Sequence, residues 1–195
     1  MTEATVVPVE IYTEMTPNPE TMKFVTDKML LPNASADFPD EASARVSPLA
    51  TELFGFPYIK GVFLMNNFVT LTKNAETEWF DVVPALRDFI KGYLQDKKEI
   101  VQEGFRPVNN NAASAADEDA VVAKIKEMLD NYVKPAVEMD GGAIQFKNYH
   151  EGKVTLMLQG SCSGCPSSMI TLKSGIEGLL KRMVPEVQEV VAESI

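Results

Sequence analysis

The sequence contains few residues of the kinds that carry out nucleophilic or metal chemistry. Its 195 residues include two cysteines, one histidine and one tryptophan. We find no Ser–His–Asp set, no paired carboxylates at a suggestive spacing and no complete phosphate-binding glycine motif. The sequence therefore predicts a protein that is not an enzyme. Two cysteines are also too few for a disulfide framework at this length, which indicates a metal or redox pair in a reducing compartment.

Basic residues and long apolar runs are scarce as well. The chain has 28 Asp and Glu against 18 Lys and Arg, a formal net charge of −10 at pH 7. Nucleic acid binding needs Lys and Arg to replace counterions, so we expect no nucleic acid partner. No apolar run is long enough to span a bilayer, so we expect no membrane partner. Residues 1–10 lack the basic flank of a secretory signal and the Arg-rich character of a transit peptide, which favours a cytoplasmic bacterial protein or a mature organellar matrix protein.

The remaining composition is that of an ordinary globular protein, 45% hydrophobic and 24% charged. The segment from Pro107 to Ala116 departs from it, because its residues are small and polar and have little to bury. We therefore expect an α+β fold with two small α/β-type domains joined by a flexible linker. The expected bounds are residues 1–98 for the first domain, 99–116 for the linker and 117–195 for the second domain.

In the N-terminal domain, alternating apolar and polar residues predict a strand over residues 6–12. Asn18 and Pro19 suit the cap and the first position of a short helix. The apolar residues of that helix follow at helical spacing: Met22, Val25 and Met29.

Three later elements of this domain follow more directly from the sequence. Ser47 and Pro48 predict the start of a helix, by the same capping argument. Two strands within residues 59–73 are joined at Asn66 and Asn67, because asparagine tolerates the positive φ of a tight hairpin turn. A last helix begins near Trp79, with apolar residues at helical spacing.

The C-terminal domain is predicted to have the order α-β-β-α-β. Its first helix starts at Asp117 or Asp119 and ends at the glycine pair Gly141–Gly142. The apolar stripe of that helix is Val121, Ile125, Met128, Leu129, Tyr132 and Val133. Strands over residues 144–149 and 153–159, a helix over 166–183 and a strand over 187–191 complete a helix layer on a small mixed sheet.

Both cysteines, Cys162 and Cys165, lie on the predicted turn between the second strand and the second helix of this domain. Free backbone N–H groups and the dipole at a helix N-terminus favour a thiolate over a thiol. Gly160 and Gly164 let the backbone approach whatever the sulfurs bind. We therefore expect a functional pair of thiols rather than two core residues.

Three chemistries are open to a C-x-x-C pair: thiol–disulfide exchange, zinc binding and an iron–sulfur cluster. A thioredoxin-like pair follows the first strand of a βαβ unit, whereas this pair follows the second strand of a hairpin. A closed structural zinc site needs four Cys or His ligands, which two cysteines and one histidine do not supply. His150 lies in a predicted hairpin turn, where we expect it to be solvated and not a ligand. Cubane clusters usually take four thiolates, so the count favours a cluster or metal shared across a symmetric dimer.

Two sets of motifs resemble a known family. Residues 133–142 (VKPAVEMDGG), 154–168 (VTLMLQGSCSGCPSS) and 171–177 (TLKSGIE) resemble the C-terminal domain of NifU-like (Nfu) iron–sulfur proteins. The N-terminal Nfu domain of that family is similar to residues 16–19 (TPNP), 47–50 (SPLA) and 68–73 (FVTLTK). Together the motifs extend over nearly the whole chain.

The resemblance implies a scaffold or carrier that receives a [4Fe–4S] cluster from an upstream donor and passes it to client apoproteins. Cys162 and Cys165 match the cluster ligands of the family, with the cluster bridging the two protomers of a homodimer. The N-terminal domain is expected to help recognise clients or delivery partners. The alternative is a C-x-x-C dithiol–disulfide oxidoreductase, and a third class is an interaction adaptor whose cysteines are structural or bridged by zinc.

Overall fold

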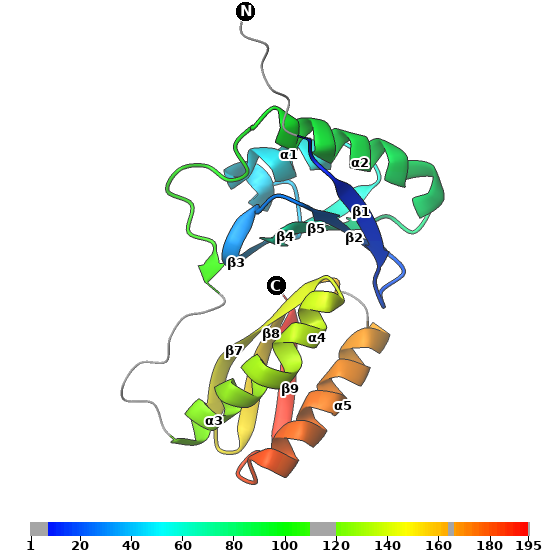
Figure 1. Ribbon diagram of the computed structural model, residues 1–195. Coiled ribbons are helices and arrows are strands. Elements are labelled where there is room, and N and C mark those ends of the chain that lie inside the picture. The colour runs from blue at the N-terminus through cyan, green and yellow to red at the C-terminus, as the bar shows by residue number, and fades with distance from the viewer. Residues whose placement is uncertain (1–7, 110–119, 164–165, 195) are drawn as a thin grey trace, which may run out of the picture. The chain divides into compact units, whose positions relative to one another are not determined.

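The computed structural model describes residues 8–109, 120–163 and 166–194. The chain forms two units: the described part of the first consists of residues 8–15 and 20–108, and that of the second of residues 16–19 and the described residues from 109 onward. Each unit packs helices against a sheet with antiparallel strand pairs, so the predicted α+β fold with two domains is confirmed (Figure 1). Within the described ranges, no helix combines the length and hydrophobicity that a membrane span requires.

The first unit is built on an antiparallel sheet. Five strands pair in the order β1-β2-β5-β4-β3, and the short strand β6 lies next to β3. In chain order the elements are β1 (Ile11–Met15), β2 (Thr21–Thr26), β3 (Leu31–Phe38), a 3-10 turn (Ser43–Val46), α1 (Pro48–Phe54), β4 (Ile59–Asn66), β5 (Phe68–Lys73), α2 (Trp79–Gln95) and β6 (Val108–Asn109). Helices α1 and α2 lie on the same side of this sheet (Figure 1).

The predictions for α1, α2 and the hairpin are confirmed. Ser47 caps α1, because its Oγ accepts a hydrogen bond of 3.1 Å from the backbone N–H of Ala50. Met65 of β4 pairs with Phe68 of β5, so Asn66 and Asn67 form the tight turn. Asn66 has a φ of 44°, the left-handed conformation for which asparagine was expected.

The helix predicted from Pro19 to Met29 is wrong. Residues Thr21–Thr26 form strand β2 instead, which pairs with β1 on one side and β5 on the other. Pairing on both edges and the β-branched side chains of Thr21, Val25 and Thr26 favour the strand over the helical spacing of the apolar residues. The strand predicted over residues 6–12 starts later, since β1 begins at Ile11 and residues 1–7 lie outside the described ranges.

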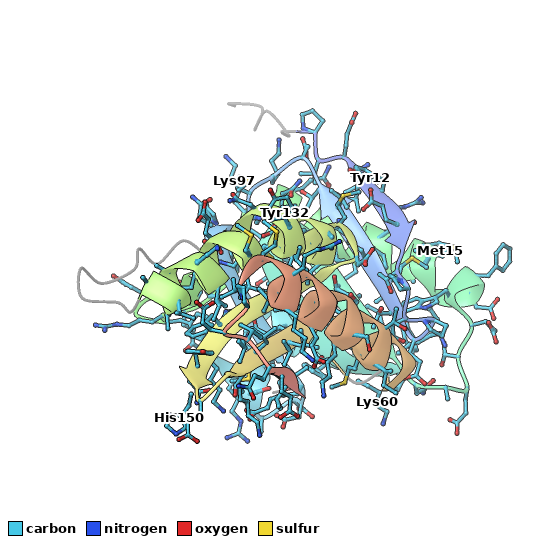
Figure 2. All side chains as sticks on the ribbon, turned by 90° about the horizontal axis from the view of Figure 1, so that it is seen from below. Tyr12, Met15, Lys60, Lys97, Tyr132 and His150 are labelled. Atoms are coloured by element: carbon cyan, nitrogen blue, oxygen red, sulfur yellow. The ribbon has the colours of Figure 1, made fainter. Side chains whose placement is uncertain are left out.

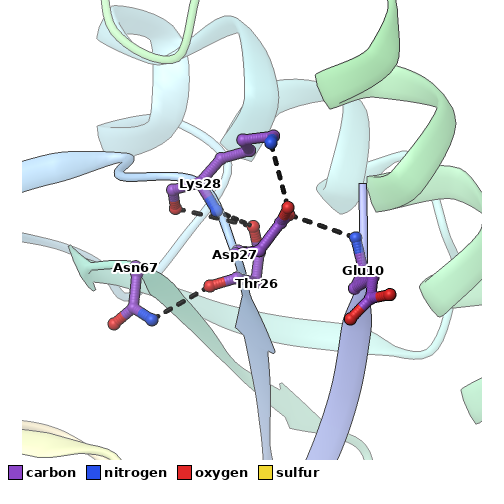
Figure 3. A network of polar contacts seen from close by, with 5 residues as sticks. All are labelled: Glu10, Thr26, Asp27, Lys28 and Asn67. Carbon is purple, nitrogen blue, oxygen red and sulfur yellow. Dashed lines mark hydrogen bonds and ion pairs between the residues drawn. The ribbon is translucent and has the colours of Figure 1, made fainter. Parts of the chain in front are cut away.

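A polar network fixes the turn that follows β2 (Figure 3). Asp27 Oδ1 accepts a hydrogen bond of 3.1 Å from the backbone N–H of Glu10, and Asp27 Oδ2 lies 2.9 Å from Lys28 Nζ. Asn67 Nδ2 donates to the carbonyl oxygen of Thr26 at 2.9 Å. The hydrogen bond from Lys28 lowers the pKa of Asp27. These contacts join the ends of β1 and β2 to the β4–β5 turn.

The first unit continues beyond residue 98. Tyr93 donates its hydroxyl hydrogen to the carbonyl oxygen of Glu99 at 2.6 Å, and Ser47 Oγ donates to the carbonyl oxygen of Ile100 at 2.6 Å. The ring of Phe105 packs 6.2 Å from that of Phe38 in the first core. Residues 99–105 therefore contact the first unit, whereas residues 110–119 of the expected linker lie outside the described ranges.

The second unit has the predicted order α-β-β-α-β. Its sheet has the order β7-β8-β9, in which β7 and β8 are antiparallel and β8 and β9 are parallel. The elements are α3 (Ala120–Met128), a π-helical turn (Leu129–Val133), α4 (Lys134–Met139), β7 (Gly142–His150), β8 (Lys153–Gly160), α5 (Pro166–Met183) and β9 (Glu189–Ser194). The predicted bounds of α5 are confirmed.

The first helix of this unit deviates from the predicted stripe at Tyr132. Leu129 and Val133 are buried as expected, but Tyr132 (labelled in Figure 2) is 60% exposed. Residues 129–133 form a π-helical turn, which has more residues per turn than an α-helix and so changes the side chains that face the core. Pro135 follows directly in α4 and lacks the N–H group that a regular helix would use there.

Candidate functional site

The candidate site is the loop between β8 and α5. Strand β8 ends at Gly160 and helix α5 begins at Pro166, so both cysteines fall in the predicted connection. Cys162 is described by the structure, whereas Cys165 and Gly164 lie outside the described residues. The C-terminal end of α4 lies at the same end of the unit as the start of α5 (Figure 1).

A tight turn begins the cysteine loop. Gly160 has a φ of 65°, a conformation that other residues adopt only with strain. The backbone N–H of Ser163 donates to the carbonyl oxygen of Gly160 at 3.0 Å, and Ser163 Oγ donates to the same oxygen at 2.8 Å. The turn places Ser161 and Cys162 at its two central positions.

Ser161 attaches the loop to the junction between α4 and β7. Its backbone N–H donates to the carbonyl oxygen of Gly141 at 3.3 Å, and its hydroxyl donates to the carbonyl oxygen of Asp140. Asp140 is the C-cap of α4, where carbonyl groups have no donor within the helix. The hydroxyl of Ser161 therefore satisfies a helix terminus and also holds the start of the loop.

Gly142 leaves space for the sulfur of Cys162. A Cβ atom at Gly142 would lie 2.7 Å from the carbonyl oxygen of Gln159 and 2.9 Å from Cys162 Sγ. The sequence predicted a helix stop here, which Gly141 confirms with a φ of 81°. The sequence analysis did not predict the role of Gly142 beside the cysteine. Gly141 alone is enough to end the helix, so the presence of a second glycine was the signal that could have indicated this role.

Cys162 is buried in the core of the second unit. It belongs to the same buried cluster as apolar side chains of α3, α4, α5 and the sheet. Burial raises the pKa of the Cys162 thiol to about 11; a hydrogen bond with Ser161 lowers it and the charge of Asp140 raises it further. The predicted preference for the thiolate is therefore wrong for Cys162, because this sulfur lies against the strand side of the loop and not at the N-terminus of α5.

His150 lies at the opposite end of the β7–β8 hairpin from the cysteine loop. His150 is exposed at the β7–β8 turn, as predicted, and its Nε2 lies 3.8 Å from a carboxylate oxygen of Glu151 (Figure 2). In the part of the chain that the structure describes, no three His, Cys, Asp or Glu side chains converge to hold a metal ion.

Comparison with known proteins adds an independent result. Residues 11–97 match the family model described as scaffold protein Nfu/NifU N terminal, and residues 125–191 match the NifU-like domain. The human protein named NFU1 iron-sulfur cluster scaffold homolog, mitochondrial, is 41% identical over 92% of this chain and 70% of its own length. The homologue of the same name from Drosophila willistoni is 39% identical, over 92% of this chain and 62% of its own length, so this chain spans less than two thirds of that protein.

Among solved structures, the NifU-like protein from Saccharomyces cerevisiae matches with a TM-score of 0.45 and 21% identity, over 54% of this chain and 92% of that protein. The family assignment comes from the two family models and the identity to the human protein, which agree with the predicted resemblance. This chain belongs to the Nfu/NifU family of iron–sulfur cluster scaffold proteins, which are not enzymes, and it has an N-terminal Nfu domain and a C-terminal NifU-like domain.

Proposed function

We propose that this chain binds a [4Fe–4S] cluster between two protomers through Cys162 and Cys165, and transfers it to client apoproteins. The observation that carries the proposal is that the chain has two cysteines, both in the single loop between β8 and α5. Thiolates are the usual ligands of such clusters. Membership of a family of iron–sulfur scaffolds supports the same chemistry.

The number of ligands supports a shared cluster. A cubane cluster usually takes four thiolates, and one chain supplies two. A second copy, related by a two-fold axis, supplies the other two from the same loop. The cluster-loaded form is therefore a homodimer, and each protomer alone holds half of the site.

The number of ligands from one protomer suits a cargo that must be released. Each chain supplies two thiolates, and thiolates of a client can replace them one at a time. A single chain that held the cluster with all four ligands would resist this exchange.

The two domains have different roles in this proposal. Residues 117–195 carry the cluster, and residues 1–105 contact clients or upstream cluster donors. The rest of the predicted linker, which was expected over residues 99–116, joins the two as a flexible connection. The thiols require a reducing compartment, either the bacterial cytoplasm or an organellar matrix. Matching relatives from human and Drosophila are named as mitochondrial proteins.

Anaerobic reconstitution with ferrous iron and sulfide tests the proposal. Visible absorption and native mass spectrometry should show two chains with one four-iron cluster. Cys162→Ala and Cys165→Ala should each abolish cluster binding and leave the circular dichroism unchanged, whereas the matched loop variant Ser163→Ala keeps both sulfurs. A full cluster in either cysteine variant would disprove the ligand assignment.

The alternative function is a dithiol–disulfide oxidoreductase. A colourless monomer with an intramolecular disulfide after reconstitution would favour it, together with a two-electron reduction potential in the cellular range. A catalytic thiol of that kind has a lowered pKa and is partly exposed. Cys162 is buried, which is unlike the partly exposed thiol that such a reaction needs.

A further inference from the structure

Strand β1 is a regular edge of the sheet in the first unit. It pairs with β2 on one side without a register shift, and in the described part of the chain no strand pairs with its other side (Figure 1). At the other end of the sheet, β3 has a register shift between Leu31 and Ser35, contains Pro32 and has β6 beside it. Bulges, prolines and covering segments block an edge, so β1 is the edge that is open to a further strand.

The backbone of β1 presents hydrogen-bonding groups on this open side. The N–H of Asp27 donates to the carbonyl oxygen of Glu10 at 3.2 Å, so the backbone groups of Glu10 point toward β2. Such groups alternate in direction along an antiparallel strand. The N–H and carbonyl groups of Ile11, Thr13 and Met15 therefore point away from β2, and they offer one side of a β-ladder.

A groove between β1 and α2 adjoins the open edge. Its volume is about 400 Å³, and it is lined by residues 9–12 and by Arg87, Asp88 and Lys91 of α2, all within the first unit. Ile11 packs against the core that the helices cover, so α2 lies on the face of the sheet to which Ile11 points. Side chains alternate between the two faces of a strand, so every second side chain of a strand added beside β1 would face the side of α2.

The α2 side of the groove carries more positive than negative charge. Arg87 and Lys91 are four residues apart and therefore share one face of the helix. Asp88 lies 3.8 Å from Arg87 Nε, whereas Lys91 forms no ion pair among the residues that the structure describes. A carboxylate on the α2 side of an added strand would supply the missing partner.

The other end of the edge is apolar. Met15, the last residue of β1, is 87% exposed, and Phe80, in the first turn of α2, is 89% exposed. The rings of Phe24 and Trp79 lie 6.5 Å apart, and Phe24 pairs with Thr13, so α2 begins near this end of β1. The two exposed apolar side chains therefore lie away from the charged groove.

We propose that the open edge of β1 binds an extended segment of a client or donor protein as an additional antiparallel strand. An acidic side chain of that segment faces Arg87 and Lys91, and apolar side chains on the same face lie toward Met15. Strand addition of this kind obtains affinity from main-chain hydrogen bonds and specificity from alternate side chains. The inference rests on the proposed function in one respect, the assignment of client and donor contacts to the first unit.

Titration with a synthetic peptide tests the edge. The probe is the capped peptide Thr-Val-Thr-Val-Thr-Glu-Thr, added to ¹⁵N-labelled full-length protein. In an antiparallel arrangement its glutamate reaches the groove, and the two valines lie on the same face. Saturable chemical-shift changes should be largest at the amides of Ile11, Thr13 and Met15. A control peptide with lysine in place of glutamate should bind about 10-fold more weakly, because it meets two cations.

Two variants separate the backbone edge from the charges. Thr13→Pro removes an N–H group that β2 does not use, so β1 should keep its place while peptide binding weakens by about 10-fold. Lys91→Glu should weaken binding of the glutamate peptide by about 5-fold and strengthen that of the lysine peptide. Lys60→Glu, at an exposed position of β4 (labelled in Figure 2), is the matched charge control and should change neither. Thermal melts followed by Trp79 fluorescence verify that each variant is folded.

Equal peptide binding by wild type and a folded Thr13→Pro would overturn the proposal, as would shift changes confined to other surfaces. Self-association that Thr13→Pro abolishes, without peptide binding by wild type, would show that the edge pairs with a second copy and would also overturn it. Cys162→Ala should bind the peptide as wild type does, because the cysteine loop is no part of this surface. Failure of cluster reconstitution would overturn the proposed function, and failure of peptide binding would overturn this inference alone.

Discussion

The carboxylate of Glu177 in α5 accepts a hydrogen bond of 3.1 Å from the backbone N–H of Val190 in β9. The other oxygen of the same carboxylate accepts from Lys181 Nζ at 2.6 Å, one helical turn further along. Both interactions favour the charged carboxylate and lower the pKa of Glu177, with the hydrogen bond from Lys181 as the larger cause. One side chain thus connects the helix that follows the cysteine loop to the parallel strand.

Glu177→Gln should make the second unit less stable at neutral pH and reduce its sensitivity to acid. Because the folded-state pKa is lowered, the stabilisation by Glu177 is present above the ordinary pKa of 4.5 and is lost as the pH falls through the folded-state value. The difference between wild type and variant should therefore shrink below about pH 4. Thermal melts between pH 3 and pH 7 measure it, with Glu186→Gln on the exposed turn after α5 as control. A constant difference over this range would contradict the prediction.

Gly142→Ala should destabilise the second unit by about 1–3 kcal/mol and impair cluster binding, because the new methyl group must displace Cys162 Sγ or the carbonyl of Gln159. Gly178→Ala is the matched control. Nothing lies within 4 Å of a Cβ at Gly178, so alanine should stabilise α5 by about 0.5–1 kcal/mol. Denaturant unfolding followed by far-ultraviolet circular dichroism compares the two variants. Equal effects would show that the space beside Cys162 is not restricted.

Tyr93→Phe should destabilise the first unit by about 1 kcal/mol, because the hydroxyl bound to the carbonyl oxygen of Glu99 is lost. Burial, with smaller contributions from the charges of Glu52 and Glu99, raises the pKa of Tyr93 to about 12. The neutral hydroxyl is therefore favoured in the folded state, and its stabilisation is lost as the pH rises from about 10 through 12. The variant should lose less stability than wild type over this range.

The single tryptophan makes this measurement specific. Trp79 is the first residue of α2, so its fluorescence follows unfolding of the first unit. Tyr93→Phe should shift the unfolding transition that is followed by tryptophan fluorescence. Gly142→Ala should shift the transition that is followed by circular dichroism and leave the fluorescence transition unchanged. A fluorescence shift of the same size in Gly142→Ala would mean that the two units unfold together.

Leu180→Ala should destabilise the second unit by about 2–5 kcal/mol, because the side chain is fully buried between α5 and the sheet. The matched control Ile170→Ala removes a side chain that is 66% exposed on the same helix and should change stability by less than about 1 kcal/mol. Urea unfolding measures both variants. A larger effect at Ile170 would mean that α5 presents the opposite face to the core.

Elements with a strong local pattern could be predicted from the sequence. The turn at Asn66 and Asn67, the cap at Ser47 and the bounds of α5 depend on neighbouring residues, and all are confirmed. Strand β2 could not be predicted, because its conformation is determined by the two strands that pair with it and these lie elsewhere in the chain. Local helical spacing was misleading where long-range pairing decides the structure.

The candidate site, like the fold, could be predicted from the sequence only in part. The C-x-x-C spacing identified the loop, and its place between β8 and α5 is confirmed. The burial of Cys162 could not be predicted, because it depends on Asp140 and Gly142, which are about twenty residues earlier in the chain and meet the loop only through the β7–β8 pairing. Ser161 had no distinguishing feature in the sequence, since serine is common in turns.

The mixed sheet of the second unit has a consequence for the order in which the domain folds. Strands β7 and β8 are joined by the two residues Glu151 and Gly152, so they can form a hairpin locally and early. Strand β9 pairs in parallel with β8 only after α5 has crossed the sheet, a slower and less local step. Transient opening should therefore release α5 and β9 as one cooperative unit while the hairpin stays paired. Cys162 lies on the connection between these two parts, so we expect its surroundings to be complete only once α5 and β9 have packed.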